Sequence, residues 1–140
     1  MIKRILILVF ALILTTGIVF AKTTNSYDKS GNKTGSYRET SSGTINKYDR
    51  SGNKVGSYKT SGERTYSYDK SGNKTGSYRT SGSTTYSYDK SGNKTGSYKS
   101  SGSRTNAYDK SGNKTGSYKK DSSGRVTEYD KSGNKVGSYR

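Results

Sequence analysis

The chain has 140 residues, a formal net charge of +16 at pH 7, and neither cysteine nor histidine. Disulfides are therefore excluded, no side chain titrates near neutral pH, and the usual soft metal ligands are missing. The positive charge favours anionic partners, although the same lysines would also keep a flat sheet soluble and block edge-to-edge pairing.

The first 21 residues have the pattern of a secretory signal peptide. Lys3 and Arg4 form a basic start, an apolar run follows from residue 5 to residue 20, and Ala21 completes a cleavage site of small residues. The run is a little short for a membrane-spanning helix, which needs about 20 apolar residues. We expect cleavage after Ala21, with an uncleaved N-terminal anchor as the alternative. The mature protein is then secreted, periplasmic or on the cell surface.

After a short lead over residues 22–26, residues 27–140 consist of six tandem repeats. Each repeat has the core Tyr-Asp-Lys/Arg-Ser-Gly-Asn-Lys-Thr/Val-Gly-Ser-Tyr-Lys/Arg, and the cores begin 20 or 21 residues apart. The cores start at Tyr27, Tyr48, Tyr68, Tyr88, Tyr108 and Tyr129. After residue 21 the chain has few aliphatic residues, a composition that normally predicts disorder. Tyrosine, however, is a strong strand former, and every tyrosine lies at a repeated position.

Each repeat carries two turn signals about ten residues apart. In the third copy, Asp69 opens a turn that Gly72 closes, and residues 80–82 (Thr-Ser-Gly) follow the same logic. The strands between such turns would have about seven residues. The sequence therefore predicts an all-β fold, a repetitive antiparallel β-hairpin meander of about twelve short strands that forms an open twisted sheet, a spiral or a solenoid.

Three-residue loops at both turns fix a register for these strands. This register places Lys74 between Tyr68 and Tyr88, where its ammonium group could rest on the ring faces. Because side chains alternate across a strand, one face is predicted to carry Tyr66, Tyr68, Lys74, Gly76, Tyr78, Tyr86 and Tyr88, with the glycine leaving room for the neighbouring rings. The first and fifth copies have one extra residue in their second loop, which a longer loop must absorb or the next strand would change faces.

The sequence around the repeated aspartates does not match a catalytic or metal site. Catalysis needs convergent carboxylates or a nucleophile beside a base, and calcium needs several acidic groups, whereas each turn offers one aspartate between basic residues. We interpret them as turn openers. The sequence indicates no cofactor, no metal and no enzymatic activity.

The Tyr/Lys face is the candidate binding site, through Tyr66, Tyr68, Lys74, Tyr78, Tyr86, Tyr88, Lys94 and Tyr98. Aromatic rows suit sugar rings and lysines suit acidic groups, which favours a glycan or an anionic envelope polymer as the partner. Stacking of single-stranded nucleic acid is a less favoured alternative. The tyrosines could equally form the protein's own core, or a face for self-association into a fibre or matrix.

Residues 62–73, Gly-Glu-Arg-Thr-Tyr-Ser-Tyr-Asp-Lys-Ser-Gly-Asn, resemble the repeat of the YD-repeat (Rhs-type) family, and residues 124–130 fit it too. The resemblance implies an exported protein that builds a spiral β shell or acts at a cell surface. This chain differs in having only six repeats, no toxin domain and Lys after Gly-Asn. Choline- and glucan-binding wall repeats are similar in period, and MORN-type repeats share the Gly-x-x-x-Gly-x-Tyr spacing of residues 72–78.

Overall fold

The computed structural model describes residues 23–140, and the predicted signal peptide lies outside them. Within this range every regular element is a β-strand, so no helix there is long and apolar enough to cross a membrane. The strands are β1 (Thr23–Asp28), β2 (Lys33–Glu39), β3 (Ile45–Asp49), β4 (Lys54–Ser61), β5 (Arg64–Asp69), β6 (Lys74–Ser81), β7 (Thr84–Asp89), β8 (Lys94–Ser101), β9 (Arg104–Asp109), β10 (Lys114–Lys120), β11 (Val126–Asp130) and β12 (Lys135–Tyr139). The all-β hairpin meander of twelve strands is confirmed, and its first strand begins within the predicted lead.

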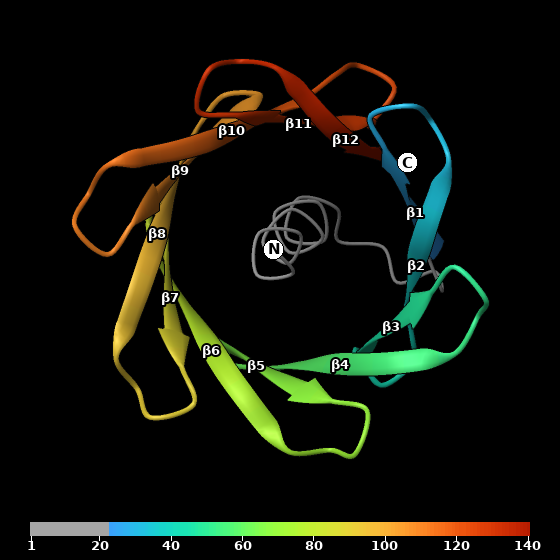
Figure 1. Cartoon of the computed structure of the whole chain (residues 1–140). Helices are drawn as coiled ribbons and strands as arrows, with labels where there is room; N and C mark the ends of the chain where they lie inside the picture. The colour runs from blue at the N-terminus through green and yellow to red at the C-terminus, as the bar shows by residue number, and fades with distance from the viewer. Residues whose placement is uncertain (1–22) are drawn as a thin grey trace.

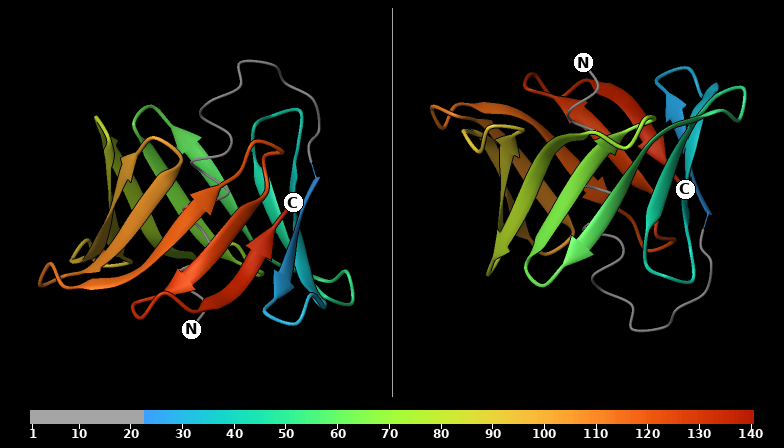
Figure 2. Two further views of the ribbon diagram at one scale, coloured as in Figure 1. Left: turned by 90° about the horizontal axis from the view of Figure 1, so that it is seen from above. Right: turned by 90° about the horizontal axis from the view of Figure 1, so that it is seen from below.

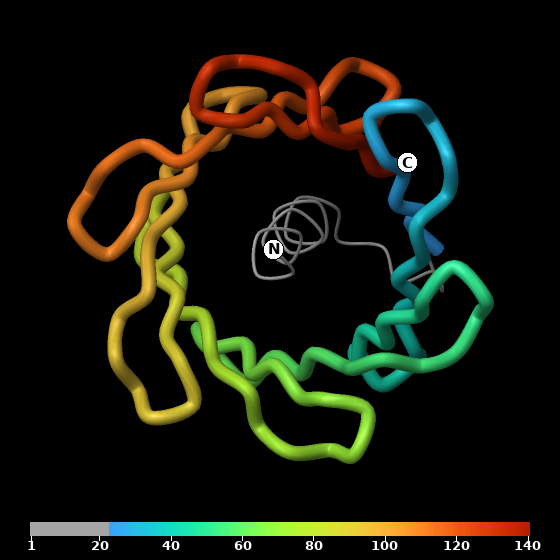
Figure 3. Tube along the Cα trace, in the orientation of Figure 1, coloured from blue at the N-terminus to red at the C-terminus, as the bar shows by residue number. Residues whose placement is uncertain are grey.

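The twelve strands close into a barrel, because β12 pairs antiparallel with β1 (Figure 1). The trace of the chain runs once around the barrel axis and returns to its start (Figure 3). We call the inside of the barrel the lumen. The predicted open sheet, spiral or solenoid is therefore wrong. Every sheet twists, and a β-bulge adds curvature to its strand. Six equivalent bulged hairpins add up to a full circle, which a single repeat does not reveal.

The first turn of each repeat agrees with the prediction. The main-chain N–H of Asp69 donates to the carbonyl of Asn73 at 3.0 Å, and the N–H of Gly72 donates back to the carbonyl of Asp69 at 3.2 Å. Gly72 has a φ of +86°, a conformation that glycine adopts without steric cost. The six turns of this kind lie along one rim of the barrel, and the second turns and both ends of the described chain lie along the other (Figure 2).

The second turn is tighter than predicted in three repeats. Ser81 pairs with Thr84, so only Gly82 and Ser83 form the loop between β6 and β7. Gly82, with a φ of +55°, takes the first central position, as a type II′ turn requires. In the first and fifth copies the extra residue is absorbed in the loop: Thr40 and Thr44 close a three-residue loop. No strand changes faces there.

A β-bulge changes the predicted register in every hairpin. Tyr68 lies opposite Lys74 as expected, but the next pair is Ser67 with Gly76, which leaves Thr75 as the extra residue. An extra residue moves all later side chains of the strand to the opposite face. Tyr78 thus turns into the lumen while the tyrosines of β5 and β7 stay outside. The predicted single Tyr/Lys face is therefore wrong.

Gly76 is also not flanked by two tyrosine rings. It pairs with Ser67 of β5 and with Asp89 of β7. Since Tyr66 pairs with Ser77 and Tyr88 also pairs with Ser77, the small residue between the outer rings is the serine.

Candidate functional site

Six of the eight predicted binding residues lie together on the outside of the barrel. They are Tyr66 and Tyr68 on β5, Lys74 on β6, Tyr86 and Tyr88 on β7, and Lys94 on β8. The four rings are half-buried and both lysines are exposed. We call these six residues the outer Tyr/Lys surface.

Pairs of rings on this surface share a serine between them. Tyr66 and Tyr88 flank Ser77, which is only 4% exposed although it faces outward. Two strand spacings separate the flanking residues, about 9.5 Å. The same arrangement recurs at Ser97, which is 7% exposed and lies between Tyr86 and Tyr108.

Basic side chains lie over outer tyrosine rings at five places around the barrel, two of them on the outer Tyr/Lys surface. Lys74 Nζ lies 5.1 Å from the centre of the Tyr66 ring, and Lys94 Nζ lies 5.0 Å from that of Tyr86. The other three contacts are Arg38 over Tyr48, Lys99 over Tyr108 and Arg140 over Tyr27. The predicted cation–ring contact of Lys74 thus exists, but with Tyr66 rather than with Tyr68 and Tyr88.

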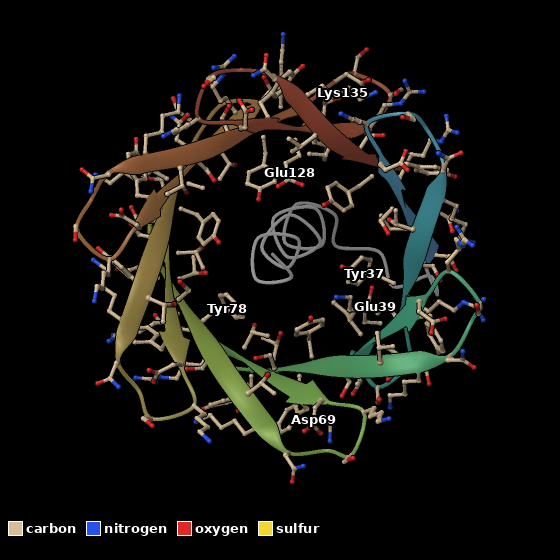
Figure 4. The ribbon with its side chains drawn as sticks, in the orientation of Figure 1. Tyr37, Glu39, Asp69, Tyr78, Glu128 and Lys135 are labelled. Carbon is tan, nitrogen blue, oxygen red and sulfur yellow. The ribbon has the colours of Figure 1, made fainter. Side chains whose placement is uncertain are left out.

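The other two predicted residues, Tyr78 and Tyr98, point into the lumen, as Figure 4 shows for Tyr78. They belong to a tyrosine belt, made by the last tyrosine of each core: Tyr37, Tyr58, Tyr78, Tyr98, Tyr118 and Tyr139. Burial raises the pKa of Tyr78 well above its ordinary value of 10, with a further contribution from Tyr98 and Tyr58 nearby. The belt is the core of the barrel, so the prediction that tyrosines form the protein's own core holds for these six.

The repeated aspartates act in the turns. Asp69 accepts hydrogen bonds from the main-chain N–H groups of Ser71 and Asn73 and from the Asn73 side chain. These bonds, first that of the Asn73 main chain, hold the pKa of Asp69 below its usual value. In the described part of the chain no three acidic residues gather into a group that could hold a metal ion.

Several charged residues of the lumen wall escaped the sequence analysis, among them Glu39 on β2, Lys47 on β3 and Glu128 on β11. Lys47 and Glu128 stand where Ser26, Ser67 and Ser87 stand in other repeats. The signal was available: an alignment of the six repeats shows a charge at a position otherwise occupied by Ser or Ala. The bulge residue changes with it, since Val55 and Val136 replace the threonine in these same two repeats.

The bulge and this inward position form one unit. Where serine and threonine stand, Thr75 Oγ1 donates to Ser67 Oγ at 2.9 Å, and Thr95 makes the same bond to Ser87. A valine offers no hydroxyl, so the charged residues of the other two repeats are released from this bond and can reach into the lumen.

Glu128 binds two members of the tyrosine belt. The Tyr139 hydroxyl donates to Glu128 Oε2 at 2.9 Å, and the Tyr118 hydroxyl donates to Oε1 at 3.3 Å. Figure 4 shows Glu128 pointing into the lumen from β11. Its carboxylate is therefore satisfied by the protein.

Lys47 lies on another part of the lumen wall and lines a cavity of about 470 Å³. The belt contributes Tyr58, Tyr78 and Tyr98 to the same cavity. Burial lowers the pKa of the Lys47 ammonium group. Among residues 23–140 the single ion pair joins Arg79 to Glu63, so no carboxylate of that range forms an ion pair with Lys47.

No protein-family model matches the chain, and no curated protein matches its sequence.

Proposed function

We propose that the chain is a non-enzymatic exported protein that binds an acidic glycan or another anionic polymer of a cell surface through its outer Tyr/Lys surface. The observation that carries the proposal is the repeated placement of a lysine over a half-buried outer ring, at Tyr66 and again at Tyr86. Tyrosine rings offer flat apolar area to sugar rings, and the cations beside them attract carboxylate or phosphate groups.

The repetition adds to the argument. The contact between β5 and β6 recurs between β7 and β8, two strands further around the barrel. A linear polymer that meets one such contact can meet the next without leaving the surface, which raises its overall affinity through effective concentration. The net charge of +16 supports the same class of partner.

Residues found at the same position in other repeats give conservative substitutions for the test. Asparagine stands at the position of Tyr66 and Tyr86 in other repeats, as Asn25, Asn46 and Asn106. The double variant Tyr66→Asn, Tyr86→Asn therefore keeps a side chain that the barrel already accommodates. We expect it to bind an acidic polysaccharide such as polygalacturonate about tenfold more weakly, since each lost cation–ring–sugar contact is worth about 0.5–1 kcal/mol.

The binding experiment uses the purified protein at low and at high salt. Affinity should fall as salt rises, because screening weakens contacts between exposed charges. Replacement of Tyr66, Tyr68, Tyr86 and Tyr88 together should abolish binding. Undiminished binding by that quadruple variant, with its β circular-dichroism spectrum intact, rules the proposal out.

Self-association into a fibre or matrix is the second candidate, and the closure of the barrel defines what it requires. A closed barrel has no free edge to pair with another molecule, so the seam between β1 and β12 must open first. This seam has three paired positions, Ser26–Tyr139, Tyr27–Ser138 and Asp28–Gly137, whereas β4 and β5 have six. Filaments that sediment and that grow faster when the seam is weakened would favour this function over polymer binding.

A further inference from the structure

The proposed function uses only the outside of the barrel and gives no role to Lys47 and the cavity of the lumen. We propose that the lumen is a second, separate binding site that takes an acidic sugar, a mono- or disaccharide bearing a carboxylate or a phosphate, with its anionic group on Lys47. The site faces inward. Tyr68 and Tyr88 border its cavity as well as the outer Tyr/Lys surface, but Lys47, which would hold the anion, belongs to the lumen alone.

The first argument is space. A barrel of about 8 strands is filled by its own side chains, whereas barrels of 16–18 strands leave an open channel. Twelve strands lie between these limits, and the cavity of about 470 Å³ falls in the range of small-molecule sites.

The second argument is charge. Lys47 is half-buried and projects from β3 into a wall made mostly of hydroxyl and apolar groups. Asp69, Asp89 and Asp109 also line the cavity, but their carboxylates accept hydrogen bonds within their own turns. A cation in such a place is costly unless an anion accompanies it.

Two other charged side chains point inward close to the belt. Glu128 is already held by Tyr118 and Tyr139. Glu39, on β2 beside Lys47, forms no ion pair with it. An anionic group from outside would complete the surroundings of Lys47.

The third argument is the chemistry of the remaining wall. Tyr58, Tyr78 and Tyr98 contribute aromatic rings to the wall, and Ser67 and Ser87 contribute hydroxyl groups. Thr75 and Thr95 also line the cavity. Rings with many hydroxyl donors and acceptors match a polyhydroxylated ring better than they match an apolar ligand or a bare inorganic anion.

The fourth argument is that the barrel does not need a lysine at this position. Serine at the equivalent positions of β5 and β7 is compatible with the same strand pairing on both sides. Lys47 and Val55 thus replace a serine and a threonine with which the repeat folds equally well. We ascribe the replacement to ligand binding.

The test compares the purified protein with its Lys47→Ser variant by calorimetric titration and by ligand-observed NMR. The probes are galacturonate and a hexose phosphate, with galactose as the neutral counterpart and inorganic phosphate as the anion without a sugar. We expect one molecule of an anionic sugar to bind per barrel. Lys47→Ser should weaken it about ten- to a hundredfold, the value of a hydrogen bond to a charged group in a partly enclosed site. The two anionic probes distinguish a uronic acid from a sugar phosphate as the natural source.

The matched controls are Lys47→Arg, which keeps the cation and should retain binding, and Lys70→Ala, which removes an exposed turn lysine outside both sites and should leave sugar binding unchanged. Equal affinity of the protein and Lys47→Ser overturns the proposal, as does the absence of binding by either anionic sugar. Inorganic phosphate binding as tightly as the hexose phosphate also overturns it. Loss of binding only in Lys74→Ala, which removes an outer lysine, would assign the sugar to the outer surface instead. The proposed polymer binding can fail without affecting these results.

Discussion

The carbonyl oxygen of Tyr88 lies 2.6 Å from the point that a Cβ atom on Gly76 would occupy. The strand β7 approaches β6 this closely because the bulge at Thr75 bends the chain inward just before the glycine. The same close approach to a tyrosine carbonyl occurs at Gly56 and Gly96. This glycine of the repeat is thus required by main-chain packing.

Gly76→Ala should therefore lower the free energy of unfolding by about 1–3 kcal/mol, the usual cost of an added methyl group in a tightly packed site. Chemical denaturation followed by circular dichroism measures the loss. Ser71→Ala, an exposed turn position, is the control and should change stability by no more than about 0.5 kcal/mol. Equal stability of the two variants would contradict this account of the glycine.

The turn aspartates predict an acid limit to stability. Asp69 has a pKa below its usual value because the Asn73 main-chain N–H, then the Asn73 side chain, bonds its carboxylate. A pKa that folding lowers gives stabilisation that is complete above the unfolded value, about 3.9, and is lost as pH falls through the folded pKa. The thermal midpoint should hold from neutral pH to about pH 4 and then decline.

A matched variant isolates one turn. Asp69→Asn removes one titrating group while retaining a turn-forming residue, so its thermal midpoint should be lower at neutral pH and should depend less on acid. An unchanged acid profile in this variant would show that the carboxylate bonds are not the source of the acid limit.

The tyrosine belt predicts an alkaline limit as well. Burial raises the pKa of Tyr58 and, with contributions from Tyr58, Glu128 and Tyr78, that of Tyr37. A pKa that folding raises gives stabilisation that is complete below the unfolded value of about 10 and is lost as pH rises further. Ultraviolet titration of the phenolate should show a late group of belt tyrosines that ionises together with unfolding.

Glu128 sharpens this prediction. Burial raises the pKa of Tyr139 most, and the Glu128 carboxylate raises it further through its charge and its hydrogen bond. Glu128→Gln keeps an acceptor but removes the charge, so Tyr139 should ionise at lower pH than in the unchanged protein. NMR of ring-labelled tyrosine resolves the residue, and Tyr58, for which burial alone raises the pKa, should not move.

The seam between β1 and β12 predicts a local opening. Arg140 extends the pairing beyond Tyr139: its N–H donates to the Asn25 carbonyl at 3.0 Å, and the Asn25 N–H donates to the Arg140 carbonyl at 2.7 Å. Its guanidinium group also lies 4.5 Å from the centre of the Tyr27 ring. Deletion of Arg140 should weaken the seam by about 1–3 kcal/mol.

Hydrogen exchange at the amides of β1 and β12 measures this weakening. Arg140→Ala is the matched control, since it keeps both main-chain bonds and loses only the cation, and its effect should be about 0.5–1 kcal/mol. Exchange as slow in the deletion variant as in the unchanged protein would show that Arg140 is not part of the closure.

The sequence predicted the local features and failed on those that accumulate along the chain. The hairpin from Asp69 to Asn73 was predicted correctly because the chemistry of that turn is contained in five adjacent residues. The face of Tyr78 was not, because Thr75 bulges and the Gly82 turn is one residue shorter than assumed. Each of these differences shifts the register by a residue, which is enough to exchange inside and outside.

Closure and the lumen site are harder still to read from sequence. Whether Tyr27 meets Ser138 depends on the summed twist and bend of six hairpins, and no single repeat contains that sum. Lys47 could have been noticed as a departure from the repeat, but its inward direction follows only once the register is known. The sequence correctly predicted that Lys74 lies over a tyrosine ring, but the ring, on the outside of the barrel, is that of Tyr66 and not those of Tyr68 and Tyr88.

The seam has one last consequence. Ser138 meets Tyr27, and Gly137 meets Asp28, just as Ser36 meets Tyr48 and Gly35 meets Asp49 within the chain. The two ends of the described chain thus carry the two halves of the same strand pairing that joins each repeat to the next along the chain. Loss or duplication of one repeat by recombination between such similar stretches of coding sequence would leave both halves intact. Barrel diameter grows with strand number, so a chain with one hairpin more or fewer could close through the same seam pairing into a wider or narrower barrel, provided that the bend at each bulge adjusts to complete the circle.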